Sequence, residues 1–246
     1  MTVLDRRPHA VTSDTRGSVQ VWDLTTGTSI RELAGHTNGV RAVAVAVLDG
    51  HPHAVTSSDD RSVRLWDLTT APAHELVGHT SKVTAASVIS LRGRPCAVTG
   101  DSGGSLRLWD LATGTQVRQL AGHPGGVKAV TVLDDWPHAV TAGGDGSALV
   151  WNPFTGTRTR RLAGYTGGGA RALAVTVLNG RPHVVTGDTS GLVRVWNPNI
   201  SSRNRRWTSG LAGHNRGVTA VAVTSLNGRP CAVTGDSGGS VRLWDL

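Results

Sequence analysis

Short runs of apolar residues alternate with polar turns along the whole chain, and no apolar run approaches the length of a membrane span. Residues 40–48 (VRAVAVAVL) form a β-branched run that is typical of a buried strand. An Asp-Gly pair at 49–50 favours a hairpin turn, residues 53–57 a short second strand, and residues 62–68 a third strand. The stretch that ends at Leu76 can pair as a fourth strand. This pattern predicts an all-β fold.

The strand pattern recurs six times, once around each of six tryptophans. They are spaced 42 to 48 residues apart, and each is followed by Asp or Asn: Trp22, Trp66, Trp109, Trp151, Trp196 and Trp244. A Gly-His pair, or Gly-Tyr165 in one copy, places its second residue 28 to 31 residues ahead of the last five. Residues 91–111 and 226–246 are nearly identical copies. Four short strands cannot cover both of their faces alone, so we predict that such sheets stack around an axis.

The phased Gly-His and Trp-Asp pairs resemble the WD-repeat family, and the resemblance covers essentially the whole chain. It implies a β-propeller of six WD repeats in a single domain over residues 1–246. The wording of the repeat (GRPxAVTGDSGGSVRLWDL) resembles the bacterial, actinobacterial-style branch of the family.

The sixth repeat ends at Leu246 and has no residues for a fourth strand. We therefore expect a last blade of three strands, with an open edge that favours self-association. Two alternatives stay open. The chain is a six-bladed propeller with a three-stranded last blade, or it is an incomplete part of a seven-bladed propeller from a longer protein.

A set of His, Thr, Asp and Trp recurs within the repeats. Two copies have the acid six residues ahead of the tryptophan: His36, Thr56, Asp60 and Trp66, and His123, Thr141, Asp145 and Trp151. The family resemblance implies a structural hydrogen-bonded tetrad, and a set that recurs in blade after blade is not a single catalytic triad. In the other four copies the acid stands eight residues ahead: Asp14, Asp101, Asp188 and Asp236. In these four copies either the turn is reshaped so that the acid still reaches the tetrad, or the hydrogen bond of the acid is missing. We therefore expect the tetrads of repeats two and four to hold their blades together best, that is, to be the best stapled.

Other motifs resemble functional sites but lack the partners that those sites need. The letters GDSGG at 100–104 and 235–239 match the nucleophile segment of trypsin-like proteases, yet they occur twice, in turns, without the disulfides and triad partners. Four histidines share the start of the second strand in different repeats, too far apart for one metal ion, and we expect them at the surface: His9, His53, His138 and His183. We therefore expect no catalytic residue, no metal and no cofactor.

The formal net charge of +8 comes almost entirely from arginines that recur at repeat positions. Because they do not form one run, nucleic-acid binding is kept only as an alternative. Cys96 and Cys231 occupy equivalent places in two repeats and suggest no disulfide framework, and the N-terminal residues lack a signal-peptide layout. We expect a cytoplasmic protein that does not enter membranes.

Partner contacts are expected on the variable loops of a rigid propeller. By family resemblance, the positions after each Gly-His and the turn around residue 59 lie on the top face; the candidates are Arg41, Asp59, Lys128 and Arg171. The insertion at 200–210 is either a plain exposed loop or a basic and aromatic hot spot formed by Arg203, Arg205, Arg206 and Trp207. We predict a non-catalytic scaffold that binds other proteins, acidic ones included. The alternatives are a regulatory or docking module of a larger kinase or NTPase, and a nucleic-acid-binding surface.

Overall fold

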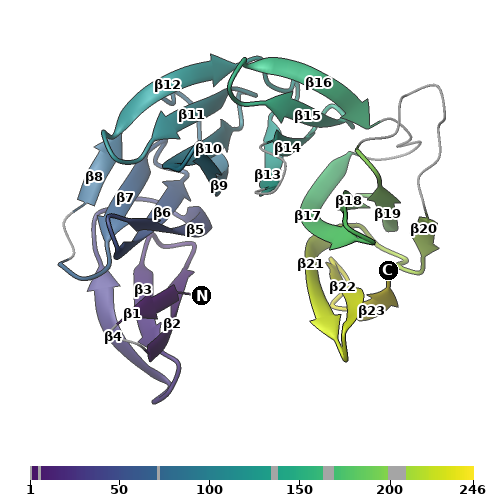
Figure 1. The fold of residues 1–246 in the computed structure, drawn as a ribbon, viewed down its shortest axis with the longest axis horizontal. Helices are drawn as coiled ribbons and strands as arrows, with labels where there is room; N and C mark the ends of the chain where they lie inside the picture. Colours follow the sequence, from purple (N-terminus) through teal and green to yellow (C-terminus); the bar gives the residue numbers. More distant parts are fainter. Residues whose placement is uncertain (1, 5–6, 71–72, 134–137, 163–168, 199–208) are drawn as a thin grey trace. The chain divides into compact units, whose positions relative to one another are not determined.

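The computed structural model describes residues 2–4, 7–70, 73–133, 138–162, 169–198 and 209–246. The chain divides into two compact units, residues 1–122 and 123–246, and each unit is described by itself. All regular elements in the described residues are β-strands (Figure 1). The expectation of one domain over residues 1–246 stays a prediction.

The first unit contains three antiparallel sheets of four strands, each joined in chain order. Their strands are β1 (Thr2–Leu4), β2 (Arg7–Ser13), β3 (Val19–Asp23) and β4 (Thr28–Leu33); β5 (Val40–Leu48), β6 (His51–Ser58), β7 (Val63–Asp67) and β8 (Ala73–Leu76); and β9 (Val83–Leu91), β10 (Arg94–Asp101), β11 (Leu106–Asp110) and β12 (Thr115–Leu120). We number these sheets as blades 1 to 3.

The second unit contains two sheets of four strands and one of three. Their strands are β13 (Val127–Leu133), β14 (His138–Gly143), β15 (Ala148–Asn152) and β16 (Thr157–Leu162); β17 (Ala170–Leu178), β18 (Arg181–Asp188), β19 (Leu192–Trp196) and β20 (Ser209–Ala212); and β21 (Val218–Leu226), β22 (Arg229–Asp236) and β23 (Val241–Asp245). These sheets are blades 4 to 6. The all-β propeller of six WD repeats and the three-stranded last blade are both confirmed.

The predicted strands of the second repeat match the structure closely. The run at 40–48 is strand β5, and the fourth strand does end at Leu76. The second strand is longer than predicted, since β6 covers residues 51–58. The strand is longer because Asp49 and Gly50 form a two-residue hairpin turn. Pairing therefore begins directly after the turn, with Leu48 opposite His51.

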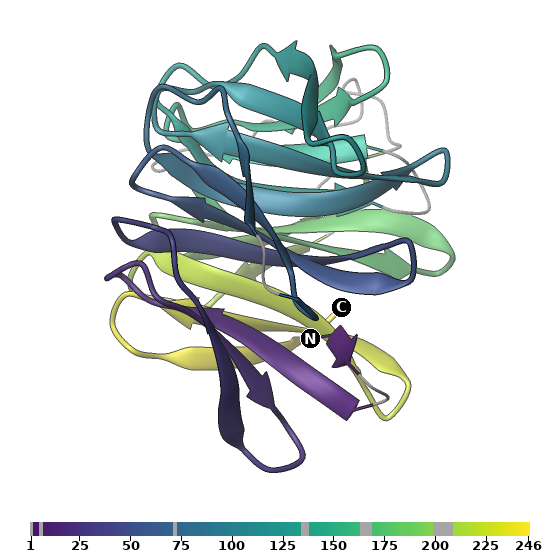
Figure 2. The same cartoon turned by 90° about the vertical axis from the view of Figure 1, so that its left-hand side faces the viewer.

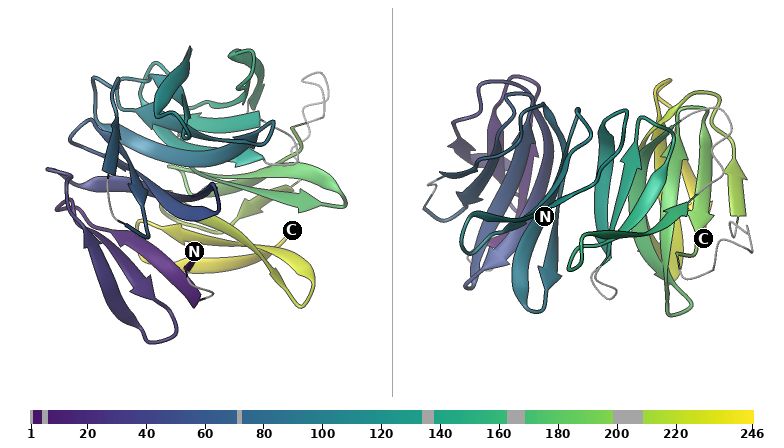
Figure 3. Two further views of the ribbon diagram at one scale, coloured as in Figure 1. Left: turned by 60° about the vertical axis from the view of Figure 1, so that its left-hand side comes forward. Right: turned by 90° about the horizontal axis from the view of Figure 1, so that it is seen from above.

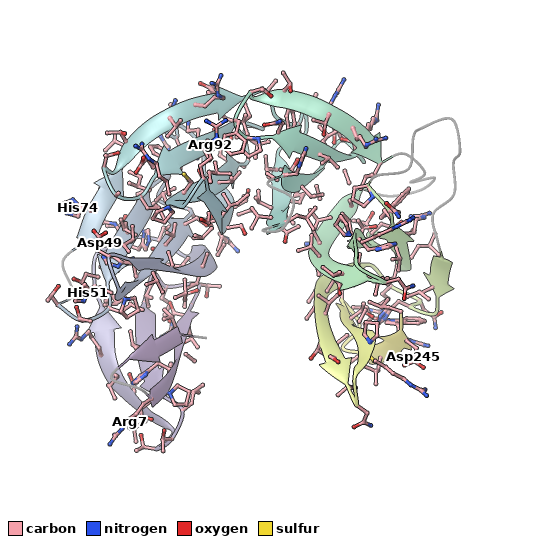
Figure 4. All side chains as sticks on the ribbon, viewed as in Figure 1. Arg7, Asp49, His51, His74, Arg92 and Asp245 are labelled. Carbon is pink, nitrogen blue, oxygen red and sulfur yellow. The ribbon has the colours of Figure 1, made fainter. Side chains whose placement is uncertain are left out.

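Four of the hairpins between first and second strands are two-residue turns of this kind. Their first residues all have a positive φ, between 49° and 53°: Asp49, Arg92, Asn179 and Asn227. A glycine with positive φ follows each of them, which gives the mirror-image turn that matches the twist of paired strands. Asp and Asn tolerate this backbone well, whereas an arginine rarely adopts it. Figure 4 marks Asp49 and Arg92 on the hairpins of blades 2 and 3.

Within each unit, successive sheets stack face to face (Figures 2 and 3). In the first unit, Val19 and Val21 of blade 1 lie buried against Ala54 and Trp66 of blade 2. Such packing is dominated by small and β-branched residues, as the strand pattern predicts.

In the second unit, the third strands of blades 5 and 6 can be compared at equivalent positions. Val193 and Val195 of strand β19 are buried against blade 6 in one cluster. Val241 and Leu243 take the same positions in strand β23, the last strand of this unit.

Candidate functional site

Each of blades 2, 3, 4 and 6 contains a buried chain of hydrogen bonds. In blade 3, the indole N–H of Trp109 (β11) donates to Oγ1 of Thr99 (β10) over 2.8 Å. Thr99 Oγ1 lies 2.7 Å from Nε2 of His79, a residue of the connection that precedes β9. Nδ1 of the same imidazole lies 2.7 Å from Oδ2 of Asp101, the last residue of β10. Residues from two strands and a connection are thereby joined.

The direction of these bonds follows from the donors available. The tryptophan can only donate, so the threonine oxygen accepts from it and gives its own proton to the imidazole Nε2. The imidazole then donates from Nδ1 to the carboxylate. This arrangement requires a neutral histidine that is protonated at Nδ1.

The electrostatics agree with a neutral imidazole. Burial lowers the pKa of three of these histidines below the ordinary value of 6.5: His36, His79 and His123. Burial by itself raises the pKa of Asp60, but hydrogen bonds from Ser62, His36 and Thr37 outweigh it and hold that pKa well below its usual range. The threonines are fully buried, so their hydroxyl groups have no access to a substrate. This set of hydrogen bonds therefore links the strands of one blade to the connection that precedes it; we call the set a staple.

Similar distances, all within 0.3 Å of those in blade 3, recur in the other three blades. In blade 2, His36 lies 2.8 Å from Asp60 and 2.7 Å from Thr56, which accepts from Trp66 over 2.8 Å. In blade 4, the corresponding distances are 3.0, 2.7 and 2.8 Å among His123, Asp145, Thr141 and Trp151. In blade 6, they are 2.9, 2.7 and 2.7 Å among His214, Asp236, Thr234 and Trp244.

The distances between acid and histidine do not single out repeats two and four, because the acid also reaches the histidine in blades 3 and 6; blades 2 and 4 differ by a serine hydroxyl 3.1 and 3.0 Å from the same Nδ1. Asp101 stands two residues earlier in its repeat than Asp60 does, and both reach the imidazole at similar distances. The reason is local: Asp60 projects from the turn after β6, whereas Asp101 ends strand β10 and its Oδ1 accepts the amide of Ser105 over 2.9 Å. The turn therefore closes around the carboxylate. Blade 6 repeats this arrangement with Asp236.

Blades 1 and 5 keep only part of the chain. Both retain the bond from tryptophan to threonine, Trp22 to Thr12 at 2.7 Å and Trp196 to Thr186 at 2.9 Å. In blade 5, the buried Asp188 instead forms an ion pair with Arg194 at 2.7 Å. Tyr165, which replaces the histidine in this repeat, lies outside the described residues.

In blade 1, Asp14 is exposed and accepts the amides of Arg16 and Ser18. Those amide bonds lower the pKa of this carboxyl below its ordinary value.

The histidines that begin the second strands are not surface residues, contrary to expectation. His9 and His183 are buried, and His53 is half-buried. Nδ1 of each lies 2.9 to 3.0 Å from the carbonyl oxygen two residues earlier. The imidazole therefore forms a local hydrogen bond with the backbone at the start of its own strand. Cys231 contacts a carbonyl oxygen in the same way. This position is a local structural one.

Both cysteines are free and buried. Burial raises the pKa of the Cys96 thiol to about 11, which keeps it protonated and unreactive. Across the described ranges, no three His, Cys, Asp or Glu side chains gather as metal ligands would. A search of those ranges for a helix long and apolar enough to span a membrane finds none.

The two GDSGG segments lie in turns that fasten neighbouring backbone. The amide of Ser102 donates to the carbonyl oxygen of Lys82 over 2.8 Å, and that of Ser237 to Gly217 over 2.9 Å. Each bond ties the turn between second and third strands to the connection that carries the Gly-His pair. We call this end of a blade its Gly-His end.

At the Gly-His end of blade 2, two cations share one carboxylate. Arg41 Nε donates to Asp59 Oδ1 over 2.9 Å, and a second Arg41 nitrogen contacts Oδ2. Lys82, from the next connection, places Nζ 3.6 Å from the same Oδ2. The bond from Arg41 lowers the pKa of Asp59 below its ordinary value.

Sequence reasoning singled out Arg41 and Asp59 but missed Lys82. It occupies a repeat position that is glycine elsewhere, and that departure was the available signal. Lys128 and Arg171 are exposed at the Gly-His ends of blades 4 and 5. The other four candidates lie outside the described residues: Arg203, Arg205, Arg206 and Trp207.

Recurring antiparallel sheets of three or four strands, joined in chain order, define a β-propeller. The chain belongs to the family described as "WD domain, G-beta repeat", whose model matches residues 27–67, 70–110, 114–152 and 205–245. Repeats of this family generally mediate protein–protein interaction and are typically non-catalytic. The matches omit residues 153–204, the stretch in which Tyr165 replaces the histidine.

Among solved structures, the chain is similar to the computationally designed Ika8 protein, with a TM-score of 0.74 and 29% sequence identity. The similarity covers 96% of this chain and 67% of the designed one. A search of curated proteins found no match.

Proposed function

We propose that this chain is a non-catalytic scaffold that holds acidic segments of partner proteins at the Gly-His ends of its blades. The observation that carries the proposal is the pairing of exposed Arg41 and Lys82, from two successive blades, around the mostly buried Asp59. An arginine has five N–H groups, so Arg41 keeps donors for a partner carboxylate beyond those that contact Asp59.

The loops that carry these side chains are held in place before any partner arrives. The amide of Asp59 donates to the carbonyl oxygen of Gly39 over 2.9 Å, and the Ser58 hydroxyl to that of Asn38 over 2.9 Å. A site on fixed loops loses little conformational entropy on binding, which favours recognition.

The test is partner retention by charge-reversed variants. The immobilised chain is incubated with cell extract, and bound proteins are quantified by mass spectrometry. A partner that is retained by wild type and by Arg118→Glu, an exposed position on strand β12, but lost by Arg41→Glu with Lys128→Glu supports the proposal. A partner set that is equal in all three samples argues against the Gly-His ends as the binding surface.

We also propose self-association through the open edge of the last blade. Strand β23 is the outer strand of a three-stranded sheet, so its backbone edge has no neighbouring strand in that sheet; Val241 and Leu243 project from one face of this edge strand. Sheet edges with apolar side chains favour pairing with another chain. Sedimentation velocity should detect a dimer or larger species that Val241→Glu with Leu243→Glu removes; a wild-type monomer at all concentrations contradicts the idea.

A cytoplasmic location and a bacterial source remain proposals. The free thiols support the first, and the wording of the repeat supports the second. Fractionation of cells that express the native gene tests the location.

A further inference from the structure

One turn in the chain departs from the repeat at a position where glycine is otherwise constant. Five repeats carry a glycine with positive φ five residues ahead of the tryptophan: Gly17, Gly104, Gly146, Gly191 and Gly239. In blade 2 this residue is Arg61, whose φ is 74°. Arg61 is exposed, and its amide donates to the carbonyl oxygen of Ser58 over 3.2 Å.

The backbone at this turn disfavours an arginine. A positive φ brings the Cβ of a long side chain close to its own backbone, which glycine avoids. The five glycines show which residue the turn accepts without strain. Because the other five repeats carry glycine at this position, the exposed Arg61 side chain is the feature that distinguishes this turn from its counterparts.

Two further departures are linked to the first one: Asp59 stands two residues before Arg61, and Lys82 places Nζ 3.6 Å from Asp59. The residue ahead of the first strand is Lys82 in blade 3 but glycine in blades 2, 4, 5 and 6: Gly39, Gly126, Gly169 and Gly217. A Cβ at Gly39 would lie 2.8 Å from the carbonyl oxygen of Thr15, so a side chain has no room at that connection. The residue seven ahead of the tryptophan is Asp59 in blade 2, where the other repeats carry Thr, Ser or Gly. Blades 2 and 3 therefore concentrate charge at positions that are neutral elsewhere.

We call Arg41, Asp59, Arg61 and Lys82 the charged junction. Its acceptors are occupied: Arg41 contacts both oxygens of Asp59, and Lys82 lies 3.6 Å from one of them. The neighbouring Asp60 accepts from His36, Thr37 and Ser62.

Its donors are in surplus. An arginine carries five N–H groups and a lysine three, and all three cations are exposed. The junction therefore presents unused donors and a net positive charge to solvent, which suits an anionic group.

We propose that the charged junction binds a carboxylate side chain of an acidic peptide, and that Arg61 is its specificity-determining residue. This inference rests on the scaffold function proposed above and names the chemistry that one part of it recognises. Asp59 orients Arg41 and Lys82, and Arg61 supplies the planar donor pair that a carboxylate accepts.

The probe is a fluorescein-labelled peptide of five Glu-Gly pairs, with a Gln-Gly peptide as the uncharged comparison, measured by fluorescence anisotropy at low ionic strength. Arg61→Gly should weaken binding of the acidic peptide at least fivefold while the melting temperature stays at or above the wild-type value. Lys82→Gly should weaken it by a similar factor.

The matched control is Arg92→Asn. Arg92 is also exposed and also has a positive φ, but it follows the nine-residue strand β9, whereas Lys82 precedes that strand. The change removes the same charge from the same kind of strained backbone and should leave peptide affinity within twofold of wild type. A salt-dependent affinity that Arg61→Gly and Arg92→Asn reduce equally overturns the proposal, because it reveals only general electrostatic attraction.

Two outcomes separate this inference from the proposed function. If Arg61→Gly binds the peptide as wild type does, the junction is not the carboxylate site, although partner loss by Arg41→Glu with Lys128→Glu can still support the scaffold. If the wild-type chain does not bind the acidic peptide but binds its phosphoserine version or single-stranded RNA, carboxylate recognition is wrong and another anion is recognised.

Discussion

Removal of the Asp101 carboxylate should destabilise the chain more than removal of the Asp60 carboxylate. In blade 2, the hydroxyl of Ser62 lies 3.1 Å from Nδ1 of His36, so a second acceptor is at hand when Asp60 is lost. In blade 3, the equivalent Ser105 hydroxyl instead accepts a bond from the Gln119 amide at 3.2 Å. Asp101→Ala therefore leaves the buried Nδ1–H of His79 without its acceptor.

The magnitudes follow from the cost of an unsatisfied buried donor. Such a group costs about 1–3 kcal/mol. Asp101 is 1% exposed, so its variant should lie at the upper end, about 3 kcal/mol. The substitute acceptor should limit the loss for Asp60→Ala to about 1.5 kcal/mol. With a urea dependence of about 2 kcal/mol per molar, the midpoints should fall by about 1.5 M and 0.8 M.

Urea-induced unfolding followed by tryptophan fluorescence measures these losses. Asp101→Asn keeps one acceptor oxygen and should recover part of the stability. Glu75→Ala removes an exposed carboxylate 3.4 Å from Arg64 and should change the free energy of unfolding by less than about 0.5 kcal/mol. An Asp60→Ala variant as unstable as Asp101→Ala, or less stable, would refute the reasoning.

Three further predictions concern other buried groups. The urea midpoint should fall as the pH drops below about 6.5, because the unfolded chain then takes up protons that the buried histidines refuse; a flat profile from pH 7.5 to 5.5 contradicts this. Arg194→Met should cost about 3–5 kcal/mol by stranding the carboxylate of Asp188, whereas Arg242→Met at the exposed equivalent position in blade 6 should cost under about 0.5 kcal/mol, as urea unfolding will show. Cys96 should react with a thiol reagent at pH 8 only after denaturation; rapid labelling of the native chain would exclude its burial.

The strands and the repeat were predictable because both depend on local pattern. Alternation, Asp-Gly turns and a period of 42 to 48 residues place the strands of blade 2 within two residues of their observed bounds. The three strands of the last blade were predictable because residues 226–246 repeat the pattern of residues 91–111. These features need no knowledge of how side chains meet.

The hydrogen-bonded staples were less predictable. The position of an aspartate in its repeat does not determine whether its carboxylate reaches the histidine on the other side of the turn. Asp101 and Asp60 arrive at the same atom of the imidazole from different backbone positions, and only the shape of each turn decides this. At the junction around Asp59, Arg41 and Asp59 were predicted as candidates but Lys82 was not. Lys82 comes from the next repeat, so a search within one repeat does not reveal it.

The histidine of each staple belongs to the connection that arrives from the preceding blade. His79 lies in the connection that follows the last strand of blade 2, and it is hydrogen-bonded to Thr99 of blade 3. Order in one blade is thereby a condition for order in the next, as in a one-dimensional array with nearest-neighbour coupling. Since the residues bonded to each histidine are only 18 to 24 positions away from it, each such step closes a short loop and forms quickly. Folding within a unit should thus spread from blade to neighbouring blade, and amide exchange should be fastest in terminal blades and slowest in interior ones.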